Sequence, residues 1–193
     1  MKIVYIQPQT SVSESPILYI KPDTAIHNRE LPLYIPDFTT DLRAQCVLMI
    51  KISKQGKCIS EKFAYKYYEQ ISLGLNLIAY DKQESLIAQD KPWEESTSFD
   101  SSMVVGTFLS LSSLRVEDPL ATFTNRGISF LERPLSCTLQ ELPFALRYIS
   151  EYITLRTGDI VVIPLSPIFH KIEAETIWEG AIQGEKIFSV MIK

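Results

Sequence analysis

The feature that most constrains this chain is a long succession of short segments rich in β-branched and aromatic residues. Such segments favour extended strands, and here short turn sequences such as "SKQGK", "TNRG" and "IQGEK" separate them. Two residues separate the strands on either side of "TNRG", which predicts a tight hairpin, and "IQGEK" predicts another. The pattern predicts ten strands, at 2–6, 17–21, 46–53, 74–80, 102–111, 120–125, 128–134, 159–165, 176–182 and 186–192.

Helical periodicity occurs in only two segments. Residues 60–72 begin with a serine and repeat apolar side chains at Phe63, Tyr67 and Ile71. Residues 138–153 begin with Thr138 and Glu141, which have the spacing of a capping box. Ten strands and two helices predict a β-rich α+β fold. Because no repeat, low-complexity tract or linker divides the chain, we expect residues 1–193 to form a single domain.

Composition excludes several partners. The net charge is -4 and the pI is about 5.3, and no basic patch suits a nucleic acid. No apolar run has membrane-spanning length, and the first residues form a strand pattern instead of a signal peptide, so we expect a cytoplasmic protein without membrane contact. The three cysteines, Cys46, Cys58 and Cys137, are far apart and odd in number, which indicates reduced structural thiols.

Chemically active residues form no familiar motif. His27 lies in a turn and His170 follows "PIF", and neither has the neighbours of a catalytic histidine. The sequence contains no glycine-rich nucleotide loop, no HExxH and no GxSxG. Glu94 and Glu95 stand at an expected helix start, where carboxylates favour the positive end of the helix dipole. Taken alone, the residues predict a fold but no active site.

The order of several blocks nevertheless resembles the fumarylacetoacetate hydrolase family, and above all its short single-domain members. The resemblance implies a mixed, β-rich roll or sandwich with a few short helices, closed around a pocket. Family members cleave diketo acids, decarboxylate 2-oxo diacids or isomerise 2-oxo-enoates, with Mg²⁺ or Mn²⁺ polarising the 2-oxo acid. The similar blocks are "ILYIKPDTAI" (17–26), "LYIPDF" (33–38), "GLNLIAYDKQ" (74–83), "KPWEESTSFDSSMVVG" (91–106), "ITLRTGDIVV" (153–162) and "IWEGAIQGEKIFSVMIK" (177–193).

The resemblance also implies where the metal ligands should stand. The family has two glutamates two residues apart, at the positions of Gln45 and Val47, and an aspartate at the position of Asn76. Period two along a strand directs the first two side chains to one face. Because a hard divalent cation needs anionic oxygen ligands, we expect no metal at these three positions and no cofactor.

Other positions of the implied pocket have changed as well. The family lysine of "AKxFD" falls at Thr97, although Asp100 is kept, and the arginine of "TARD" falls at Tyr80, with Gln83 kept. The "GTP" turn that binds a substrate carboxylate falls at 164–166, which are Pro164, Leu165 and Ser166.

Two further features lie in the N-terminal part of the chain. Lys21 is retained, and it is either a pocket residue or a solvated lysine at a strand end. The family loop with a histidine and a glutamate follows the first strand, and here the segment between Pro8 and Ser15 is short and contains no histidine.

These changes leave two hypotheses. The leading one is a catalytically inactive homologue, a pseudoenzyme that binds a small organic acid or serves assembly. The alternative is a hydrolase, isomerase or decarboxylase of a small 2-oxo or diketo acid with a metal-dependent or rebuilt site, with Lys21 supplying charge if no metal is used. The resemblance also implies a homodimer. Acids for a rebuilt site would come from Asp81, Glu84, Glu94, Glu95 and Asp100.

Overall fold

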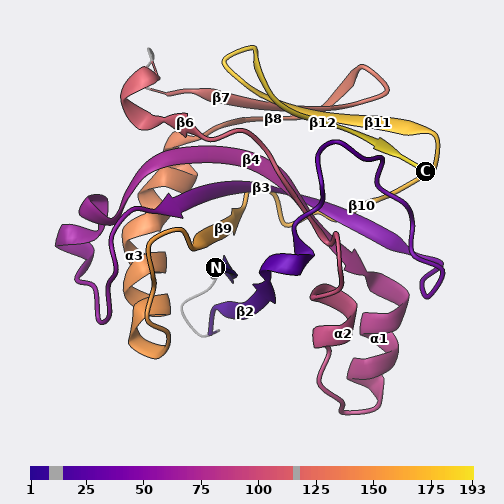
Figure 1. The fold of residues 1–193 in the computed structure, drawn as a ribbon, viewed down its shortest axis with the longest axis horizontal. Helices are drawn as coiled ribbons and strands as arrows, with labels where there is room; N and C mark the ends of the chain where they lie inside the picture. Colours follow the sequence, from indigo (N-terminus) through magenta and orange to yellow (C-terminus); the bar gives the residue numbers. More distant parts are fainter. Residues whose placement is uncertain (9–14, 115–117) are drawn as a thin grey trace.

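The computed structural model of the chain describes residues 1–8, 15–114 and 118–193. Its larger sheet has the strand order β2-β1-β9-β3-β4-β5, with β10 paired to β3 and β6 paired to β4 (Figure 1). β1 and β9 are parallel, and the other pairs are antiparallel. The strands are β1 Lys2–Gln7, β2 Ile17–Pro22, β3 Leu42–Ile52, β4 Tyr68–Ala79, β5 Met103–Val105, β6 Leu109–Ser110, β9 Ile160–Pro164 and β10 His170–Lys171.

A second, antiparallel sheet lies across the first, in the order β12-β11-β7-β8 (Figure 1). Its strands are β7 Leu120–Asn125, β8 Ile128–Pro134, β11 Thr176–Ile182 and β12 Glu185–Ile192. Both tight hairpins are confirmed, because Arg126 and Gly127 in one turn, and Gln183 and Gly184 in the other, have positive φ. The β-rich α+β class predicted from the sequence is therefore correct.

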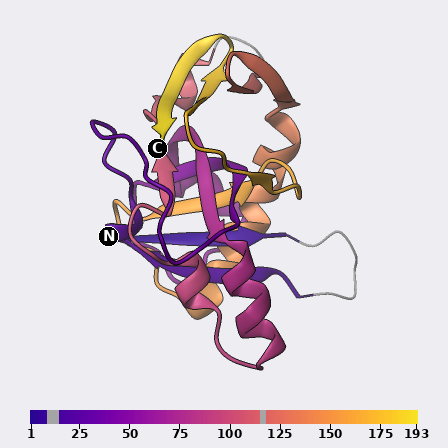
Figure 2. The same ribbon diagram turned by 90° about the vertical axis from the view of Figure 1, so that its right-hand side faces the viewer.

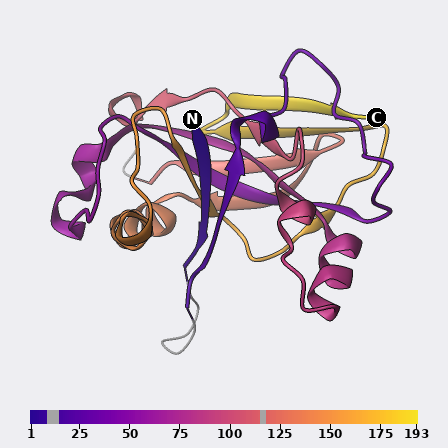
Figure 3. The same ribbon diagram turned by 60° about the horizontal axis from the view of Figure 1, so that its bottom comes forward.

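The helices lie at the edges of the larger sheet. They are α1 Tyr80–Ala88, α2 Glu94–Thr97 and α3 Ser136–Tyr152, with 3-10 turns η1 Asp23–Ala25, η2 Glu61–Tyr67 and η3 Leu111–Ser113. Figure 3 shows β1 and β2 running between α3 on one side and α1 with α2 on the other. Figure 2 shows the same β1 and β2 side by side, with the two short helices below them.

The predicted helix at 60–72 is wrong in type and extent. Only Glu61–Tyr67 is helical, as a 3-10 turn, and β4 begins at Tyr68. Residues from Tyr68 onward pair with the end of β3, so the pairing with a long neighbouring strand prevails over the local helical spacing. The predicted strand at 102–111 is likewise divided into β5 and β6.

The second predicted helix is confirmed, but its start is not. α3 begins at Ser136, two residues before Thr138, and its first backbone N–H, that of Ser136, donates to Asp118 Oδ1 at 3.1 Å. Thr138 is buried inside the first turns, so the capping box with Glu141 does not form. The Glu141 side chain therefore does not cap the start of α3.

The two faces of the larger sheet bury different side chains. On one face Leu48 and Ile50 join the main core between the sheets. On the other face Val47 and Met49 join a smaller cluster with Ile3 and neighbouring side chains of β1 and β9. Successive side chains of β3 thus point to opposite faces of the sheet. One face packs into the apolar core, and the other carries Gln45, a polar residue predicted to line the pocket.

Within the described residues, no helix is both long enough and apolar enough to cross a membrane.

Candidate functional site

Two tyrosines form the centre of the second face. Tyr5 of β1 and Tyr19 of β2 are register partners, and their rings stack with centroids 4.5 Å apart and an interplanar angle of 19°. Burial raises the pKa of both phenols. Both therefore stay protonated at neutral pH and act as neutral hydrogen-bond donors or acceptors.

Behind these rings lie two of the predicted pocket residues. Gln45 and Asn76 face each other across β3 and β4, and both are fully buried. The Tyr5 hydroxyl donates to Gln45 Oε1 at 2.8 Å, and Asn76 Nδ2 donates to the Tyr19 hydroxyl at 2.8 Å. Gln45 Nε2 also donates to the carbonyl oxygen of Ser166 at 2.9 Å. The polar start of β3 is thus tied into an uncharged network.

One atom of this network lacks a partner. Asn76 Oδ1 is buried and accepts no hydrogen bond from the described residues. An unpaired buried acceptor costs free energy, about 1–3 kcal/mol. The fold tolerates this cost, so the hydrogen bonds of this network are not all made within the described protein.

On one side of the tyrosine pair lies a hollow of about 330 Å³, here called the aromatic hollow. It faces α1 and α2. Three isoleucines line it together with four aromatic rings and two amides, which are Tyr5, Tyr19, Trp93, Phe169, Gln7 and Gln83. The Trp93 ring meets Tyr19 edge-on, with centroids 5.4 Å apart at 83°. Its lining contains no charged side chain among the described residues.

On the other side of β1 lies a smaller hollow of about 120 Å³, here called the charged cleft. Arg133 of β8 and Glu141 of α3 line it, and so does the turn Pro164–Pro167 at the end of β9. Gln7 and Pro8 complete the lining, so Gln7 belongs to both hollows. The Ser166 carbonyl links this cleft to Gln45.

The charges of the cleft are unusual for a surface. Burial raises the pKa of Glu141, and the nearby positive charge of Arg133 opposes that rise. Within the described residues neither side chain makes an ion pair of 4.0 Å or less. A carboxyl group with a raised pKa next to an available guanidinium is a candidate for binding an organic acid and moving its protons.

Lys21 has a different role from either one predicted for it. Its side chain is fully buried, and Nζ donates to the Leu77 carbonyl at 3.1 Å and to the Ser102 carbonyl and hydroxyl at 2.9 and 3.1 Å. Burial lowers the pKa of the amine, while the three acceptors use its three protons. Lys21 lines neither hollow and instead ties β2 to β4.

Several of the other residues predicted to line a pocket lie in the wall of one of the two hollows. Gln83 lies in the wall of the aromatic hollow, and Pro164, Leu165 and Ser166 lie in the wall of the charged cleft. Tyr80 lines neither, because Arg43 covers its ring at 3.6 Å.

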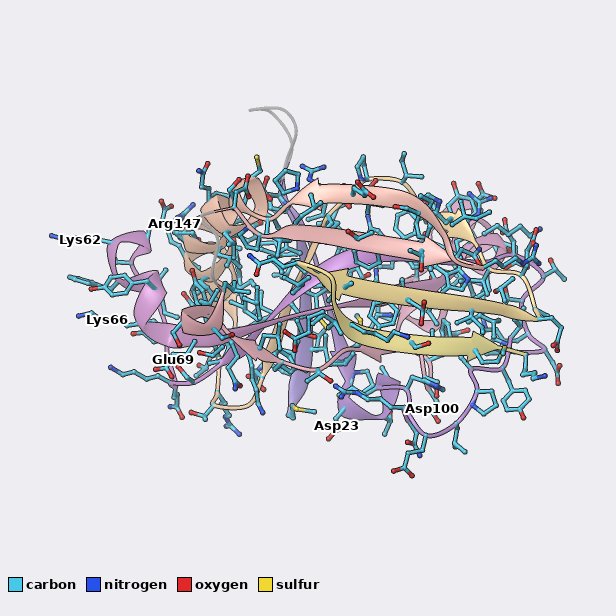
Figure 4. The ribbon with its side chains drawn as sticks, turned by 90° about the horizontal axis from the view of Figure 1, so that it is seen from above. Asp23, Lys62, Lys66, Glu69, Asp100 and Arg147 are labelled. Carbon is cyan, nitrogen blue, oxygen red and sulfur yellow. The ribbon has the colours of Figure 1, made fainter. Side chains whose placement is uncertain are left out.

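Two predicted positions lie away from both hollows. Thr97 is buried, and its hydroxyl donates to the Glu94 carbonyl at 3.3 Å. Asp100 is exposed, and Figure 4 shows it beside Asp23 at the edge of the molecule. In the same view, Asp23 and Asp100 lie far from the exposed Lys62 and Lys66 (Figure 4).

The acids proposed for a rebuilt site do not converge. Burial alone would raise the pKa of Asp81, but hydrogen bonds from Thr39, Thr40 and Lys82 prevail and lower it. Those bonds commit Asp81 to anchoring α1. The remaining acids, Glu84, Glu94 and Glu95, are exposed on α1 and α2.

Sequence analysis did not find Arg133 and Glu141. Glu141 was assigned to a capping box, and Arg133 to the end of a strand, because each has an ordinary local role. The blocks that resemble the family do not include residues 107–152, so the resemblance implied no site residue in β8 or α3. The signal available was a lone carboxylate near the start of an amphipathic helix, five residues after Ser136.

Histidines and cysteines take no part in either hollow. His27 Nε2 lies 2.9 Å from the Leu31 carbonyl, and His170 packs edge-on against Phe130 with centroids 4.7 Å apart. The three cysteines are free thiols. Residues 9–14, which replace the family's histidine loop, lie outside the described residues.

Comparison with known proteins now defines the class. The family model described as fumarylacetoacetate (FAA) hydrolase C-terminal matches residues 4–163, and the chain belongs to this family. A mitochondrial oxaloacetate tautomerase of Mus musculus is 28% identical over 181 residues, which are 90% of this chain and 81% of that protein. An oxaloacetate tautomerase of Escherichia coli is 26% identical over 156 residues, 79% of this chain and 71% of that protein.

Among solved structures, the fumarylpyruvate hydrolase of Pseudomonas aeruginosa, in complex with Mn²⁺ and pyruvate, has a TM-score of 0.87. It is 20% identical, and the match covers 100% of this chain and 89% of that one. The likeness establishes the fold, including the β-rich roll that the family resemblance implied.

Two expectations from the sequence are wrong. The inactive hypothesis is contradicted because the relatives that align with most of this chain are named as oxaloacetate tautomerases, which are active enzymes. The expectation that no cofactor is used is contradicted by a protein of the same fold that holds Mn²⁺ with pyruvate. Losing the ligand residues of one site was too narrow a basis for either conclusion.

The three family ligand positions nevertheless do not fit a divalent cation. Gln45 Oε1 is occupied by Tyr5, Val47 is an apolar side chain, and Asn76 offers a single neutral oxygen. Hard cations need several oxygen ligands, usually including carboxylates. The described residues also contain no group of three His, Cys, Asp or Glu side chains placed to hold a metal. No step below is therefore assigned to a metal.

Proposed function

We propose that the protein catalyses keto–enol tautomerisation of a small 2-oxo acid in the charged cleft. The observation that carries the proposal is that Arg133 and a half-buried Glu141, whose pKa is raised, line the same cleft. The oxaloacetate tautomerases that align with most of the chain support the reaction class.

Arg133 binds the substrate carboxylate in this proposal. A guanidinium offers a planar pair of donors that matches a carboxylate, and its charge also favours the enolate form of the adjacent oxygen. The cleft volume of about 120 Å³ is several times the ~30 Å³ that one water occupies, so it suits a ligand of few carbon atoms.

Glu141 carries the proton. Its carboxylate accepts the proton of the enol hydroxyl on C2, and the O–H electron pair forms the C2–O double bond. The C2–C3 π bond breaks, and its electron pair takes the same proton from the Glu141 carboxyl group to form the C3–H bond. One proton leaves oxygen and one arrives at carbon, so the reaction needs no oxidant or co-reactant. A carboxyl group whose pKa is raised by burial holds a proton more readily than an exposed one, which suits a group that must both accept and return it.

Ser166 and Gln45 support this arrangement from behind. The Gln45 amide holds the Ser166 carbonyl, and the Ser166 hydroxyl accepts the Ile168 backbone N–H at 3.1 Å. These bonds fix the turn that forms one wall of the cleft. The Ser166 hydroxyl donates to no acceptor among the described residues, so its proton can be offered to a ligand oxygen.

The test is the decay of the enol absorbance of oxaloacetate with and without purified protein. We expect decay faster than in buffer and proportional to protein concentration. A rate equal to that of buffer, with folded protein confirmed by circular dichroism, would contradict the proposed function.

The homodimer, the single domain and the cytoplasmic location remain proposals. Exposed apolar side chains such as Ile17, Tyr34 and Ile177 are available to cover an interface between two copies. Light scattering at micromolar concentration should give twice the mass of one 22.0 kDa chain. A single-chain mass would refute the dimer.

A further inference from the structure

We propose that the aromatic hollow binds an aromatic ring, so that the 2-oxo acids preferred by this protein carry an aryl substituent on C3. The inference rests on the proposed function for the reaction, and on the hollow alone for the substituent. Gln7 lines both hollows, so we expect the substituent to extend past Gln7 from the charged cleft into the aromatic hollow.

The first argument is the chemistry of the lining. Its four aromatic rings and three isoleucines present apolar and π-electron surface, and its polar groups are the uncharged amides of Gln7 and Gln83 and the phenols of Tyr5 and Tyr19. A second carboxylate placed here would lose its water without meeting a cation, which is costly. An aryl group has no such cost and gains edge-on and stacked ring contacts.

The second argument is size. The hollow has about 330 Å³, whereas ~150 Å³ of apolar cavity is enough to hold benzene. One ring with its linking carbon therefore fits with room to spare. The charged cleft, at about 120 Å³, is too small to take the ring as well as the acid group.

The third argument is preorganisation. The Tyr5 and Tyr19 rings are already stacked, and Trp93 stands at 83° to Tyr19, so the receiving surface needs no rearrangement. Hydrogen bonds to Gln45 and Asn76 hold the two tyrosines from behind. A rigid pocket loses little entropy when a ligand orders it further.

The fourth argument is that apolar side chains at the rim of the hollow are exposed to water. Ile17 and Ile87 border the hollow and are 48% and 55% exposed. Trp93 is only half-buried. An aryl group in the hollow would cover apolar surface that the fold leaves open to water, which supplies a driving force that oxaloacetate lacks.

The experiment compares phenylpyruvate with oxaloacetate as substrates, and 3-phenylpropionate with succinate as acids that do not tautomerise. Binding is followed by calorimetry and by tryptophan fluorescence. Trp93 lines the hollow whereas Trp178 is buried in the second sheet, so Trp93→Phe identifies the responding ring. We expect the aryl acid of each pair to bind at least about tenfold more tightly, and Trp93 fluorescence to change.

A designed variant tests the lining directly. Ile87→Arg adds a cation at the rim, and we expect it to reduce the preference for phenylpyruvate over oxaloacetate by about tenfold. Ile128→Arg is the matched control, because Ile128 is 72% exposed and lies in the β7–β8 hairpin of the other sheet. It should leave the preference unchanged, and an equal effect of both variants would count against the hollow.

The outcomes separate the inference from the proposed function. Tautomerisation of oxaloacetate with no preference for aryl acids would overturn the inference and keep the function. Binding of 3-phenylpropionate without tautomerisation of either substrate would overturn the function and the substrate class, and leave only a ring-binding hollow. Absence of both binding and turnover would overturn both.

Discussion

The two hollows on either side of β1 share one residue, Gln7, and otherwise have opposite chemistry. The aromatic hollow is held by α1 and α2 and has an uncharged lining among the described residues, whereas the charged cleft is held by α3 and β8 and contains Arg133 and Glu141. The difference teaches how this chain departs from its family. The positions at which the family resemblance implies metal ligands carry no charge, and charged side chains occur instead on elements that the similar blocks do not include.

The two hollows have different walls but share one support, Gln45. Its amide oxygen accepts from Tyr5 in the aromatic hollow, and its nitrogen donates to the Ser166 carbonyl in the turn that walls the charged cleft. Changes confined to the wall of one hollow should leave the other largely intact, whereas changes to the Gln45 network should reach both. The following predictions test that separation, from the largest expected effect to the smallest.

The largest effect should come from Glu141→Gln. The amide keeps the shape of the side chain but cannot carry a proton, so we expect the tautomerisation rate to fall about 10²-fold or more. The measurement is the enol decay of oxaloacetate. The matched control is Glu132→Gln in β8, whose exposed carboxylate lines neither hollow.

Tyr5→Phe should act on stability and on the aromatic hollow. It removes the donor to buried Gln45 Oε1, and an unsatisfied buried acceptor costs about 1–3 kcal/mol. Urea unfolding measures the change, with Tyr34→Phe as the control because Tyr34 is 68% exposed. A loss of stability no larger than that of the control would show that the network behind the rings contributes nothing.

Arg133→Gln should weaken substrate binding more than turnover. Loss of one charge-assisted pair is worth about 1.5–3 kcal/mol, so we expect KM to rise about tenfold or more. Arg126→Gln is the control, since Arg126 lies in the same sheet and pairs with exposed Glu173. An unchanged KM would remove Arg133 from the site and break the contrast between the hollows.

The smallest effect should come from Asp81→Asn, which loosens the start of α1. The pKa of Asp81 is lowered in the folded state, so its contribution is present above the unfolded pKa and is lost as pH falls through the folded value. Because Asp81 is only half-buried and the asparagine oxygen can still accept some of these hydrogen bonds, we expect a loss below about 1 kcal/mol at neutral pH. Thermal unfolding of both proteins at neutral and at acid pH measures it, and a difference that grew toward acid pH would contradict the sign.

Much of the fold was predictable, because alternating apolar residues and two-residue turns determine strands locally. The hairpins around Gly127 and Gly184 follow from a few residues each. The start of β4 at Tyr68 does not, because the helical spacing over 60–72 yields to pairing with β3, and α1, which begins at Tyr80, was not predicted. Pairing partners far along the chain are invisible to a local pattern.

The site was predictable only in part. The resemblance placed Gln45, Asn76 and Gln83 at or behind a hollow, which the structure also shows. It gave no means of placing Arg133 and Glu141 beside the turn after β9, since that contact joins β8, α3 and β9 across the two sheets. Absence of family ligands was then wrongly taken as absence of activity.

The most direct test of the central claim is the pH dependence of deuterium exchange at C3 of 2-oxobutyrate in D₂O, followed by nuclear magnetic resonance. The account predicts exchange catalysed by the protein that rises with pH through a pKa above the ordinary range of glutamate, because Glu141 must first be ionised to accept a proton. It predicts that Glu141→Gln abolishes this profile. Catalysed exchange with the same pH profile in Glu141→Gln, or no catalysed exchange in the unmodified protein, would contradict it.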